Sequence, residues 1–293
     1  MTENEDPVVA QIQLGLLLGR LRDGAEIGTE AAGKAIGTSK ASISRIENGK
    51  QSIVKENVQK LLELYEANAE DQDEALRLAA VPKPSRSRRR RDAGYRDDVP
   101  NWFRRYRTLE AAASEISTYE AEIVTGLFQT EDYARVLLQA GNPIAGRRDI
   151  DRQVELRRGR QQILERAEPP QLDVILNEAV LHRVIGDDSV MAAQLDHLVE
   201  LAEQPFIELR VLPFRPKPTP NRDEAFVAKN VFKLLRLPDR GTILYFEEVG
   251  GATYPEDTAV IERYAVSYQR LRAAAADPGD SREIIARIAN DYR

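Results

Sequence analysis

The segment Thr29–Lys50 gathers cationic, hydroxyl and amide side chains at spacings suited to contact with nucleic acid. A guanidinium such as that of Arg45 can bind a guanine edge or a phosphate, and small polar side chains such as Ser44 suit base edges. Residues three and four apart share one face of a helix, so most of these groups are expected on one polar face. We expect the contacts to come from Thr29, Ser39, Lys40, Ala41, Ser42, Ser44, Arg45, Asn48 and Lys50.

Two short helices joined by a tight turn would hold that polar face in place. Gly33 supplies a small residue where two backbones touch, and Gly37 tolerates positive φ at the turn. Ser39 is a good N-cap for the second helix, and Gly49 is a good stop. The expected core positions are Ala32, Ile36, Ile43 and Ile46. A plain αα-hairpin with a solvated face is the alternative, but small residues at both tight points favour a helix-turn-helix.

The ending I-S-R-I-E-N-G, with the glycines before it, closely resembles the Xre-type, phage-repressor-like helix-turn-helix. The resemblance implies an all-α domain of five helices within residues 1–80. Those helices are expected at Gln11–Arg22, Thr29–Ile36, Ser39–Asn48, Lys55–Glu66 and Asp71–Ala80.

The same resemblance assigns roles to single residues. Thr29 stands where the family often has a glutamine that contacts phosphate, so its contact is expected to be less complete. Glu47 matches a glutamate that pairs with an arginine of the first helix, here Arg22, so we expect Glu47 to be structural. Ala41 has no side-chain donor and can contact only a thymine methyl group. Direct base contact then rests mainly on Lys40, Ser42, Ser44 and Arg45.

Composition limits the class of protein. The chain has 293 residues, of which 42% are hydrophobic, and this allows two domains with buried cores. It has no cysteine, which removes disulfides, thiol catalysis and cysteine-ligated zinc. No apolar run is long enough for a transmembrane helix, and the acidic start lacks the basic residues of a signal peptide. We therefore expect a cytoplasmic protein that does not contact membranes and lies on the nucleoid when bound to DNA.

Charge is unevenly distributed along the chain. A formal net charge of −6 argues against binding of nucleic acid over the whole surface. Basic residues nevertheless outnumber acidic ones within residues 20–60 and again within residues 83–107. Local positive charge in and after the helix-turn-helix is expected of a regulator with a limited DNA footprint.

A basic linker, residues 81–100, is expected between the N-terminal domain and a second domain at residues 101–293. Pro82 and Pro84 end the preceding helix and favour extended backbone. Mutually repelling arginines follow at Arg86, Arg88, Arg89, Arg90 and Arg91. Two roles are open for them: a solvated tether, or a DNA-binding arm that follows phosphates or enters a minor groove.

The second domain mixes helical and strand patterns, so the chain is predicted to be α+β and mainly helical. Strands are expected at Ile116–Val124, Gln171–Leu176, Ile207–Leu212, Phe226–Leu237 and Thr242–Val249. Helices are expected at Trp102–Glu115, Thr130–Gln139, Ile150–Arg166, Glu178–Val184, Ser189–Gln204, Glu256–Ala275 and Ser281–Tyr292. The strands are too scattered for a doubly wound sheet, so we expect a small, mostly antiparallel sheet wrapped by helices.

Blocks of this half resemble an uncharacterised domain that follows Xre-type helix-turn-helices in many streptomycete-type regulators. They include TGLFQTEDYARVLL, RQVELRRGRQQIL, VILNEAVLHRVIG and ILYFEEVGG, in that order. The resemblance implies a regulator often encoded beside a small partner protein, in an arrangement compared with toxin–antitoxin pairs. The chain departs from the family at Thr125, Phe128 and the loop RPKPTPNRDE. If that loop holds a ligand or partner, its specificity has changed.

No recognisable catalytic constellation is present, so we expect no enzyme activity, no metal and no cofactor. GxGxxG, P-loop and GxSxG motifs are missing, and His182 and His197 lack the spacing of metal ligands. Candidates for contact with a ligand or partner are Gln129, Glu131, Tyr133, Glu178 and Glu247. Structural alternatives are open: a helix cap around Gln129, a core position for Tyr133, and the outward face of an edge strand for Glu247.

Two hypotheses for function follow. The first is a sequence-specific transcription regulator that binds double-stranded DNA as a homodimer, because one reader with few base contacts binds weakly. In it, the C-terminal domain senses a partner protein or a small ligand and supports dimerisation. The second is an antitoxin-like protein that sequesters a small partner and autoregulates its own operon.

Overall fold

The computed structural model describes residues 7–81, 101–216, 231–238, 241–248, 251–255 and 257–293. These residues form two compact units. The first combines Met1–Ala112 with Pro238–Gly241, and the second combines Ala113–Leu237 with Thr242–Arg293. The linker predicted at 82–100, with its five arginines, lies outside the described residues, as does most of the loop RPKPTPNRDE.

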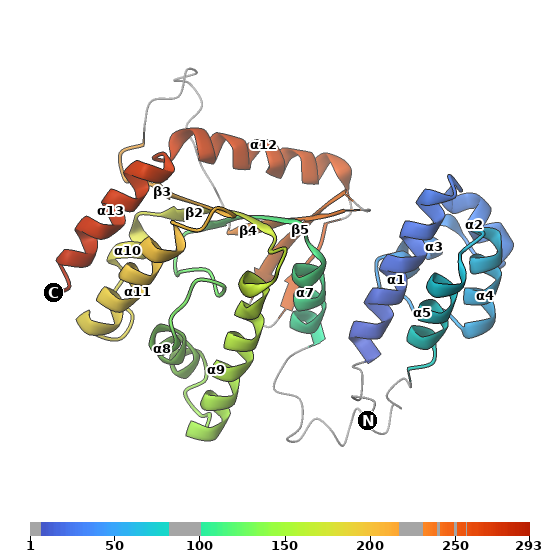
Figure 1. Cartoon of the computed structure of the whole chain (residues 1–293), viewed down its shortest axis with the longest axis horizontal. Helices are drawn as coiled ribbons and strands as arrows, with labels where there is room; N and C mark the ends of the chain where they lie inside the picture. The colour runs from blue at the N-terminus through green and yellow to red at the C-terminus, as the bar shows by residue number, and fades with distance from the viewer. Residues whose placement is uncertain (1–6, 82–100, 217–230, 239–240, 249–250, 256) are drawn as a thin grey trace. The chain divides into compact units, whose positions relative to one another are not determined.

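The first unit is helical (Figure 1). Its helices are α1 (Pro7–Gly24), α2 (Thr29–Ala35), α3 (Lys40–Glu47), α4 (Lys55–Leu64), α5 (Ala69–Ala79) and α7 (Asn101–Ala112). The five helices predicted before residue 81 are all confirmed, each within a few residues of its expected ends. Their aliphatic stripes meet in one core that includes Leu18, Ile43, Val58 and Leu61. Burial of these stripes is what makes such short helices stable.

The second unit contains a six-stranded sheet with the order β3-β2-β1-β4-β5-β6. The strands are β1 (Glu115–Glu120), β2 (Gln171–Asn177), β3 (Ile207–Leu212), β4 (Phe232–Leu237), β5 (Gly241–Glu248) and β6 (Gly251–Thr253). Strand β1 pairs in parallel with β2, and β2 pairs in parallel with β3. Strand β4 pairs antiparallel with β1, so the sheet changes direction at the β1–β4 junction.

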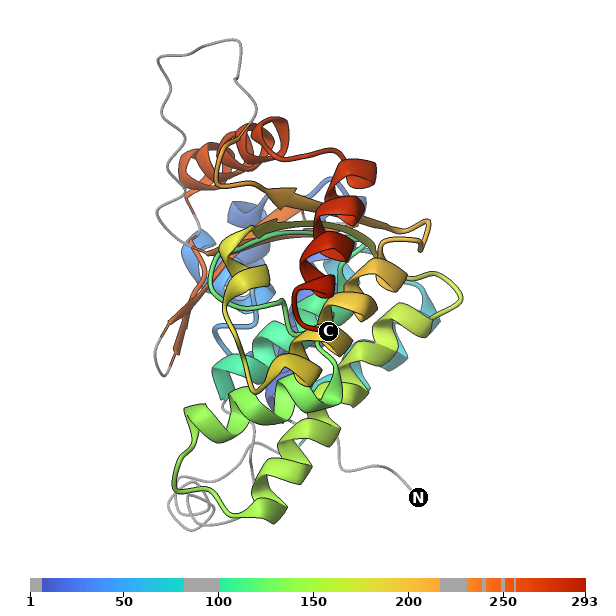
Figure 2. The ribbon, with the colours of Figure 1, turned by 90° about the vertical axis from the view of Figure 1, so that its left-hand side faces the viewer.

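Helices cover both faces of this sheet (Figures 1 and 2). They are α8 (Glu131–Gly141), α9 (Arg147–Gln161), α10 (Ala179–His182), α11 (Asp188–Leu201), α12 (Thr258–Ala274) and α13 (Pro278–Asn290), with a 3-10 turn at Gln162–Glu165. Helix α12 lies over one face, where Tyr268 and Leu271 pack against Phe232 and Leu244. Helices α8, α9 and α11 lie on the other side of the sheet (Figure 2).

The predicted α+β class is confirmed, and the sheet is mixed: β4 pairs antiparallel with β1, and β6 pairs antiparallel with β5. Strands β1, β2 and β3 are all parallel. Each of the two connections between them contains helices, which return the chain to the starting edge of the sheet before the next strand begins. Strand β6 was not predicted, since three residues carry too little periodicity. The predicted strand Phe226–Leu237 is described only from residue 231, and β4 begins at Phe232.

Candidate nucleic-acid interface

Local sequence fixes the position of α3. The hydroxyl of Ser39 caps the helix by accepting a hydrogen bond from the backbone N–H of Ser42, at 3.2 Å. Gly37 has φ of 67° at the turn before it. A Cβ at Gly33 would lie 2.7 Å from the carbonyl oxygen of Thr38, so only glycine fits between the two helices. All three features were predicted from the sequence and are confirmed.

The buried side of α3 is also as predicted. Ile43 and Ile46 are 1% and 4% exposed, and Ala32 of α2 is fully buried against the same core. A further close contact escaped prediction: a Cβ at Gly15 of α1 would lie 2.4 Å from the carbonyl oxygen of Ile46. The only sequence signal for this contact is a glycine within an otherwise apolar helical run. Glycine at this position therefore lets α1 approach the end of α3.

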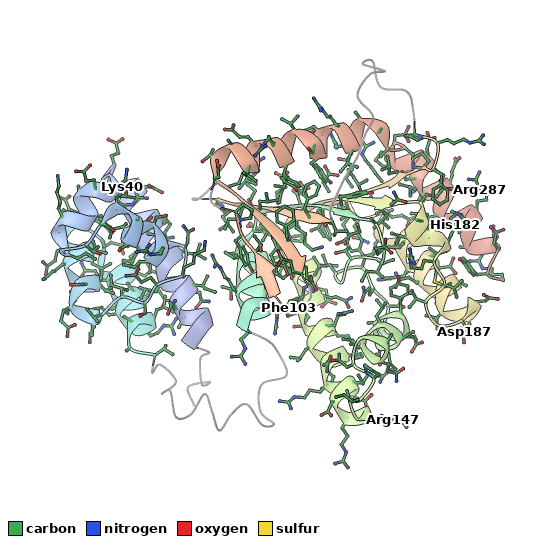
Figure 3. The ribbon with its side chains drawn as sticks, turned by 180° about the vertical axis from the view of Figure 1, so that it is seen from behind. Lys40, Phe103, Arg147, His182, Asp187 and Arg287 are labelled. Carbon is green, nitrogen blue, oxygen red and sulfur yellow. The ribbon has the colours of Figure 1, made fainter. Side chains whose placement is uncertain are left out.

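The predicted contact residues divide by exposure. Exposed positions are Ser39, Lys40, Ala41, Arg45 and Lys50, and half-buried ones are Thr29, Ser44 and Asn48. Figure 3 labels Lys40 on the helical unit. Ser42 differs from the rest because it is only 8% exposed and its hydroxyl lies 3.2 Å from the hydroxyl of Ser39. Its side chain thus offers the least surface to a ligand and serves the helix cap.

Arg45 is held by two neighbours. Its Nε donates to Oε1 of Gln51 at 3.1 Å, and its Nη2 donates to Oγ of Ser42 at 3.0 Å. Sequence reasoning missed Gln51, which lies in the turn after α3. An i, i+6 contact across a helix end has no periodic signal in the sequence.

Glu47 is buried and structural, as predicted. Its carboxylate accepts hydrogen bonds from Nε and Nη2 of Arg22 at 2.6 and 3.1 Å. This contact with Glu47 raises the pKa of the Arg22 guanidinium above its ordinary value. Burial, followed by the nearby charge of Glu47, raises the pKa of Tyr65 well above its ordinary value. The bidentate pair joins α1 to the recognition side of the bundle.

The C-terminal end of α3 is fixed by long side chains from two other helices. Gln11 of α1 donates to the carbonyl oxygen of Gly49 at 2.7 Å. Arg105 of α7 donates from Nη2 to the carbonyl oxygen of Asn48 at 3.0 Å. Cationic groups near the last carbonyls of a helix are favourable because those carbonyls carry partial negative charge.

Two C-terminal candidates prove to be internal. Gln129 is 3% exposed, donates to the carbonyl oxygen of Val124 at 2.5 Å, and accepts from Nη1 of Arg157. Tyr133 is fully buried, and its hydroxyl accepts from the backbone N–H of Val124 at 3.3 Å. Burial lowers the pKa of Arg157 to about 10, which leaves the guanidinium protonated at neutral pH. These residues hold the loop between β1 and α8 in shape.

The other three candidates lie on different elements of the fold. Glu131, on α8, forms an ion pair with Arg135 at 3.1 Å. Glu178 follows β2 and accepts from the backbone N–H of Phe214 at 2.6 Å. Glu247 is exposed on β5 and accepts from the hydroxyl of Tyr245 at 3.4 Å. Glu131, Glu178 and Glu247 thus lie on α8, after β2 and on β5.

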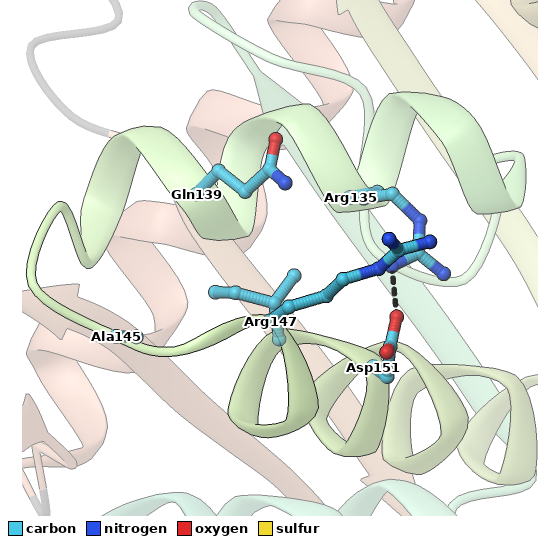
Figure 4. Close-up of a pocket in the computed structure, with 6 residues that line it drawn as sticks. Arg135, Gln139, Ala145, Arg147 and Asp151 are labelled. Atoms are coloured by element: carbon cyan, nitrogen blue, oxygen red, sulfur yellow. Dashed lines mark hydrogen bonds and ion pairs between the residues drawn. The ribbon is translucent and has the colours of Figure 1, made fainter.

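A cleft of about 550 Å³ lies between α8 and α9 (Figure 4). Its lining residues are Arg135, Gln139, Ala145, Arg147, Ile150 and Asp151. Hydrogen bonds that Arg135 donates to Asp151 and Glu131 raise the pKa of Arg135, and the two carboxylates offset its charge. The side chain of Arg147 extends along the cleft toward Arg135 (Figure 4).

The histidines do not meet in a metal site. His182 stacks on Phe214 with ring centroids 5.8 Å apart, and burial lowers the pKa of His197. Among the residues that the structure describes, no cluster of three or more His, Cys, Asp or Glu side chains could hold a metal ion. Within the same residues, no helix has the length and apolar character needed to cross a membrane.

Each half of the chain matches a known family of protein domains. Residues 103–287 match the model of a domain of unknown function, DUF5753. The chain belongs to the DUF5753 family. Residues 13–75 match a helix-turn-helix domain, which covers α2, α3 and α4 and most of α1 and α5. No curated protein and no solved structure matches the chain significantly.

The helix-turn-helix match indicates a DNA-binding regulator, in agreement with the geometry of α2 and α3. The DUF5753 match begins inside α7, although α7 belongs to the helical unit by its contacts. The first helix of the family domain in this chain therefore contributes Arg105 to the end of α3.

Proposed function

We propose that the chain is a sequence-specific transcription regulator of the Xre type that inserts α3 into the major groove of double-stranded DNA. The exposed face of α3, where Lys40, Ala41 and Arg45 lie outside a core fixed by Ile43 and Ile46, carries this proposal. Small and cationic residues on one face, with the opposite face buried, are what a recognition helix needs. The chain then acts by binding and has no catalytic role.

The number of base contacts available to α3 is small, and this favours binding as a homodimer. Ser42 is buried and Ala41 has no side-chain donor, so Lys40, Ser44 and Arg45 provide most of the polar surface. Two half-sites separated by about one helical turn, roughly 34–36 Å, would add affinity and specificity. The arginines at residues 86–91 would add contacts to phosphate that do not depend on sequence.

The decisive experiment compares two arginine variants on a DNA site selected from the genome by the purified full chain. Arg45→Ala should weaken binding by about 1–3 kcal/mol, because it removes a base or phosphate contact. Arg77→Ala is the matched control, since Arg77 is an exposed arginine on α5 that pairs with Glu74 at 2.7 Å. Fluorescence anisotropy measures both. Unchanged binding by a folded Arg45→Ala variant would refute α3 as the recognition helix.

We propose that the C-terminal domain receives the signal, and a second candidate function is antitoxin-like sequestration of a small partner protein. Exposed apolar residues favour the partner: Ile123, Val184 and Phe214 are 36%, 52% and 63% exposed. They follow β1, β2 and β3, whose carboxyl ends lie side by side in the parallel register. An ion pair of 2.7 Å between Arg183 and Glu122 also joins two of these loops.

Light scattering of the purified chain with the purified product of an adjacent gene tests sequestration. Sequestration is supported if the wild-type chain forms a stoichiometric complex and the double variant Val184→Ser/Phe214→Ser does not. The control is Val266→Ser, because Val266 is a similarly exposed apolar residue, 53% exposed, on α12. No complex with the wild-type chain would reject sequestration of that product and leave the DNA-binding proposal intact.

A further inference from the structure

The guanidinium of Arg45 is held through two of its three nitrogens. Gln51 accepts from Nε and Ser42 accepts from Nη2. Within the described part of the chain no group accepts from Nη1 of Arg45. A guanidinium has a side edge, formed by Nε and Nη2, and an end edge, formed by Nη1 and Nη2. Because Nη1 has no acceptor and the side chain is exposed, the end edge is open to a ligand at Nη1.

Both neighbours are themselves fixed. Ser42 is 8% exposed and belongs to the hydrogen-bonded cap with Ser39. The backbone N–H of Gln51 donates to the carbonyl oxygen of Arg45 at 3.1 Å, which returns the chain beside the arginine. A long side chain that is already ordered in the free protein loses less conformational entropy on binding. The arrangement therefore orients Arg45 before DNA arrives.

The direction of the Arg45 guanidinium favours contact with a base over contact with a phosphate. Contact with Ser42, three residues earlier, draws the guanidinium toward the N-terminal half of α3, which is the half that meets base edges in helix-turn-helix complexes. Ala41 lies one turn before Arg45 and on the same face, and its methyl group leaves room for the helix to approach the bases. Two parallel donors match the O6 and N7 acceptors of guanine in the major groove.

We propose that Arg45 recognises one guanine in each half-site through its end edge, and that Gln51 and Ser42 are positioning residues for this contact. The inference rests on the proposed function, since it specifies what α3 recognises. It goes beyond a general basic contact because a phosphate contact positions the protein without carrying sequence information.

The test uses the full chain and the selected DNA site, with 7-deazaguanine replacing each guanine in turn. This base keeps Watson–Crick pairing and loses only the N7 acceptor. For the wild-type chain, one replacement per half-site should weaken binding by up to the roughly 5- to 150-fold expected of a bidentate arginine–guanine contact. Arg45→Ala should bind the unmodified site more weakly and should no longer distinguish guanine from 7-deazaguanine at that position.

Variants of Gln51 test whether this residue orients Arg45 or adds affinity for DNA by itself. Gln51→Ala should reduce the discrimination against 7-deazaguanine and leave affinity for random DNA unchanged, because Gln51 would act only through Arg45. Gln51→Glu keeps the acceptor oxygen and should restore discrimination. Gln59→Ala, an exposed glutamine on α4, is the matched control and should match the wild type.

The possible failures are distinct. If Arg45→Ala weakens all sequences equally and no 7-deazaguanine position affects the wild type, Arg45 contacts phosphate and the inference is overturned. If Gln51→Ala discriminates as well as the wild type, Gln51 has no positioning role. If the wild-type chain shows no sequence preference at all, the proposed function itself fails.

Discussion

Each of the two units buries an ion pair, but the pairs join different kinds of structure. Arg22 and Glu47 are 25 residues apart and connect α1 to α3. Lys233 and Glu120 are 113 residues apart and connect β4 to β1, where the sheet changes from parallel to antiparallel. The helical pair supports an element proposed to contact DNA, whereas the sheet pair supports the junction of two halves of a scaffold.

The surroundings of the two pairs also differ. Arg22 makes further contacts with the carbonyl oxygen of Ile27 at 2.9 Å and with Asp23 at 2.6 Å. Lys233 reaches Glu120, and the hydroxyls of Thr118 and Thr125 at 3.2 and 3.5 Å. Side-chain exposure is 9% for Lys233 and 7% for Glu120, against 13% and 9% for Arg22 and Glu47. Loss of one partner should therefore cost more in the sheet than in the helical unit.

The largest effect is expected from Lys233→Ala. It leaves the carboxylate of Glu120 buried without its cation, which costs about 3–5 kcal/mol of unfolding free energy. Urea denaturation, with hydrogen exchange to follow each unit separately, measures the loss. Arg236→Ala on the same strand is the control, because its pair with Glu115 is 61% and 39% exposed and should contribute about 1 kcal/mol or less. Equal losses in the two variants would contradict the contrast between buried and exposed pairs.

Glu47→Ala should have the next largest effect, about 2–4 kcal/mol on the helical unit alone. Arg22 keeps the carbonyl oxygen of Ile27 and the carboxylate of Asp23, which limits the loss. DNA binding should fall in proportion to the unfolded fraction, and saturating DNA should recover it. A variant that is fully folded yet does not bind DNA would show that Glu47 contacts DNA directly.

These two pairs mark how far the sequence could predict the structure. The helix-turn-helix could be predicted because its glycines, caps and core residues lie within one short segment with helical periodicity. Glu47 and Arg22 were paired through a family resemblance. The pairing of Lys233 with Glu120 and the parallel β1–β2–β3 arrangement depend on contacts between distant segments, which single-sequence periodicity does not encode. Gln51 was missed because its contact with Arg45 crosses the end of a helix.

Two of the C-terminal candidates, Gln129 and Tyr133, are buried. Gln129 precedes α8 and Tyr133 lies in its first turn, and the contact of Gln129 with Arg157 of α9 joins segments that are far apart in the sequence. The exposed apolar residues Ile123, Val184 and Phe214 are separated in the sequence, and only the parallel register shows that the strands before them end side by side. A surface assembled from three loops has no local motif.

Close backbone contact gives a third prediction. Gly15→Ala places a Cβ 2.4 Å from the carbonyl oxygen of Ile46 and should destabilise the helical unit by about 1–3 kcal/mol through overpacking. Gly24→Ala, at the end of the same helix, is the control because nothing lies within 4 Å of its added Cβ. Thermal denaturation of both variants compares them. A Gly15→Ala variant as stable as Gly24→Ala would show that α1 and α3 are not in close contact.

The smallest effect expected is in the response to acid, and it again differs between the units. In the sheet domain, burial alone would raise the pKa of Glu208, but hydrogen bonds from Arg272 and Arg210 outweigh burial and lower it below 4.5. In the helical unit, a hydrogen bond from Arg77 lowers the pKa of Glu74, which lies on the surface. A lowered carboxyl pKa stabilises the fold above the ordinary pKa, and this stability is lost as pH falls through the folded-state value.

The stability difference between the wild type and Glu208→Gln should therefore be constant at neutral pH and shrink below pH 4.5. Asp173 acts in the opposite direction, because burial raises its pKa and protonation of Asp173 relieves that cost as pH falls. Glu74→Gln is the surface control and should show a smaller difference, since solvent screens its single arginine. Urea midpoints of the wild type and both variants, measured from pH 7 to pH 3, test these stability differences. A difference for Glu208→Gln that does not change over this range would mean that the Arg272 and Arg210 contacts do not favour the ionised carboxylate.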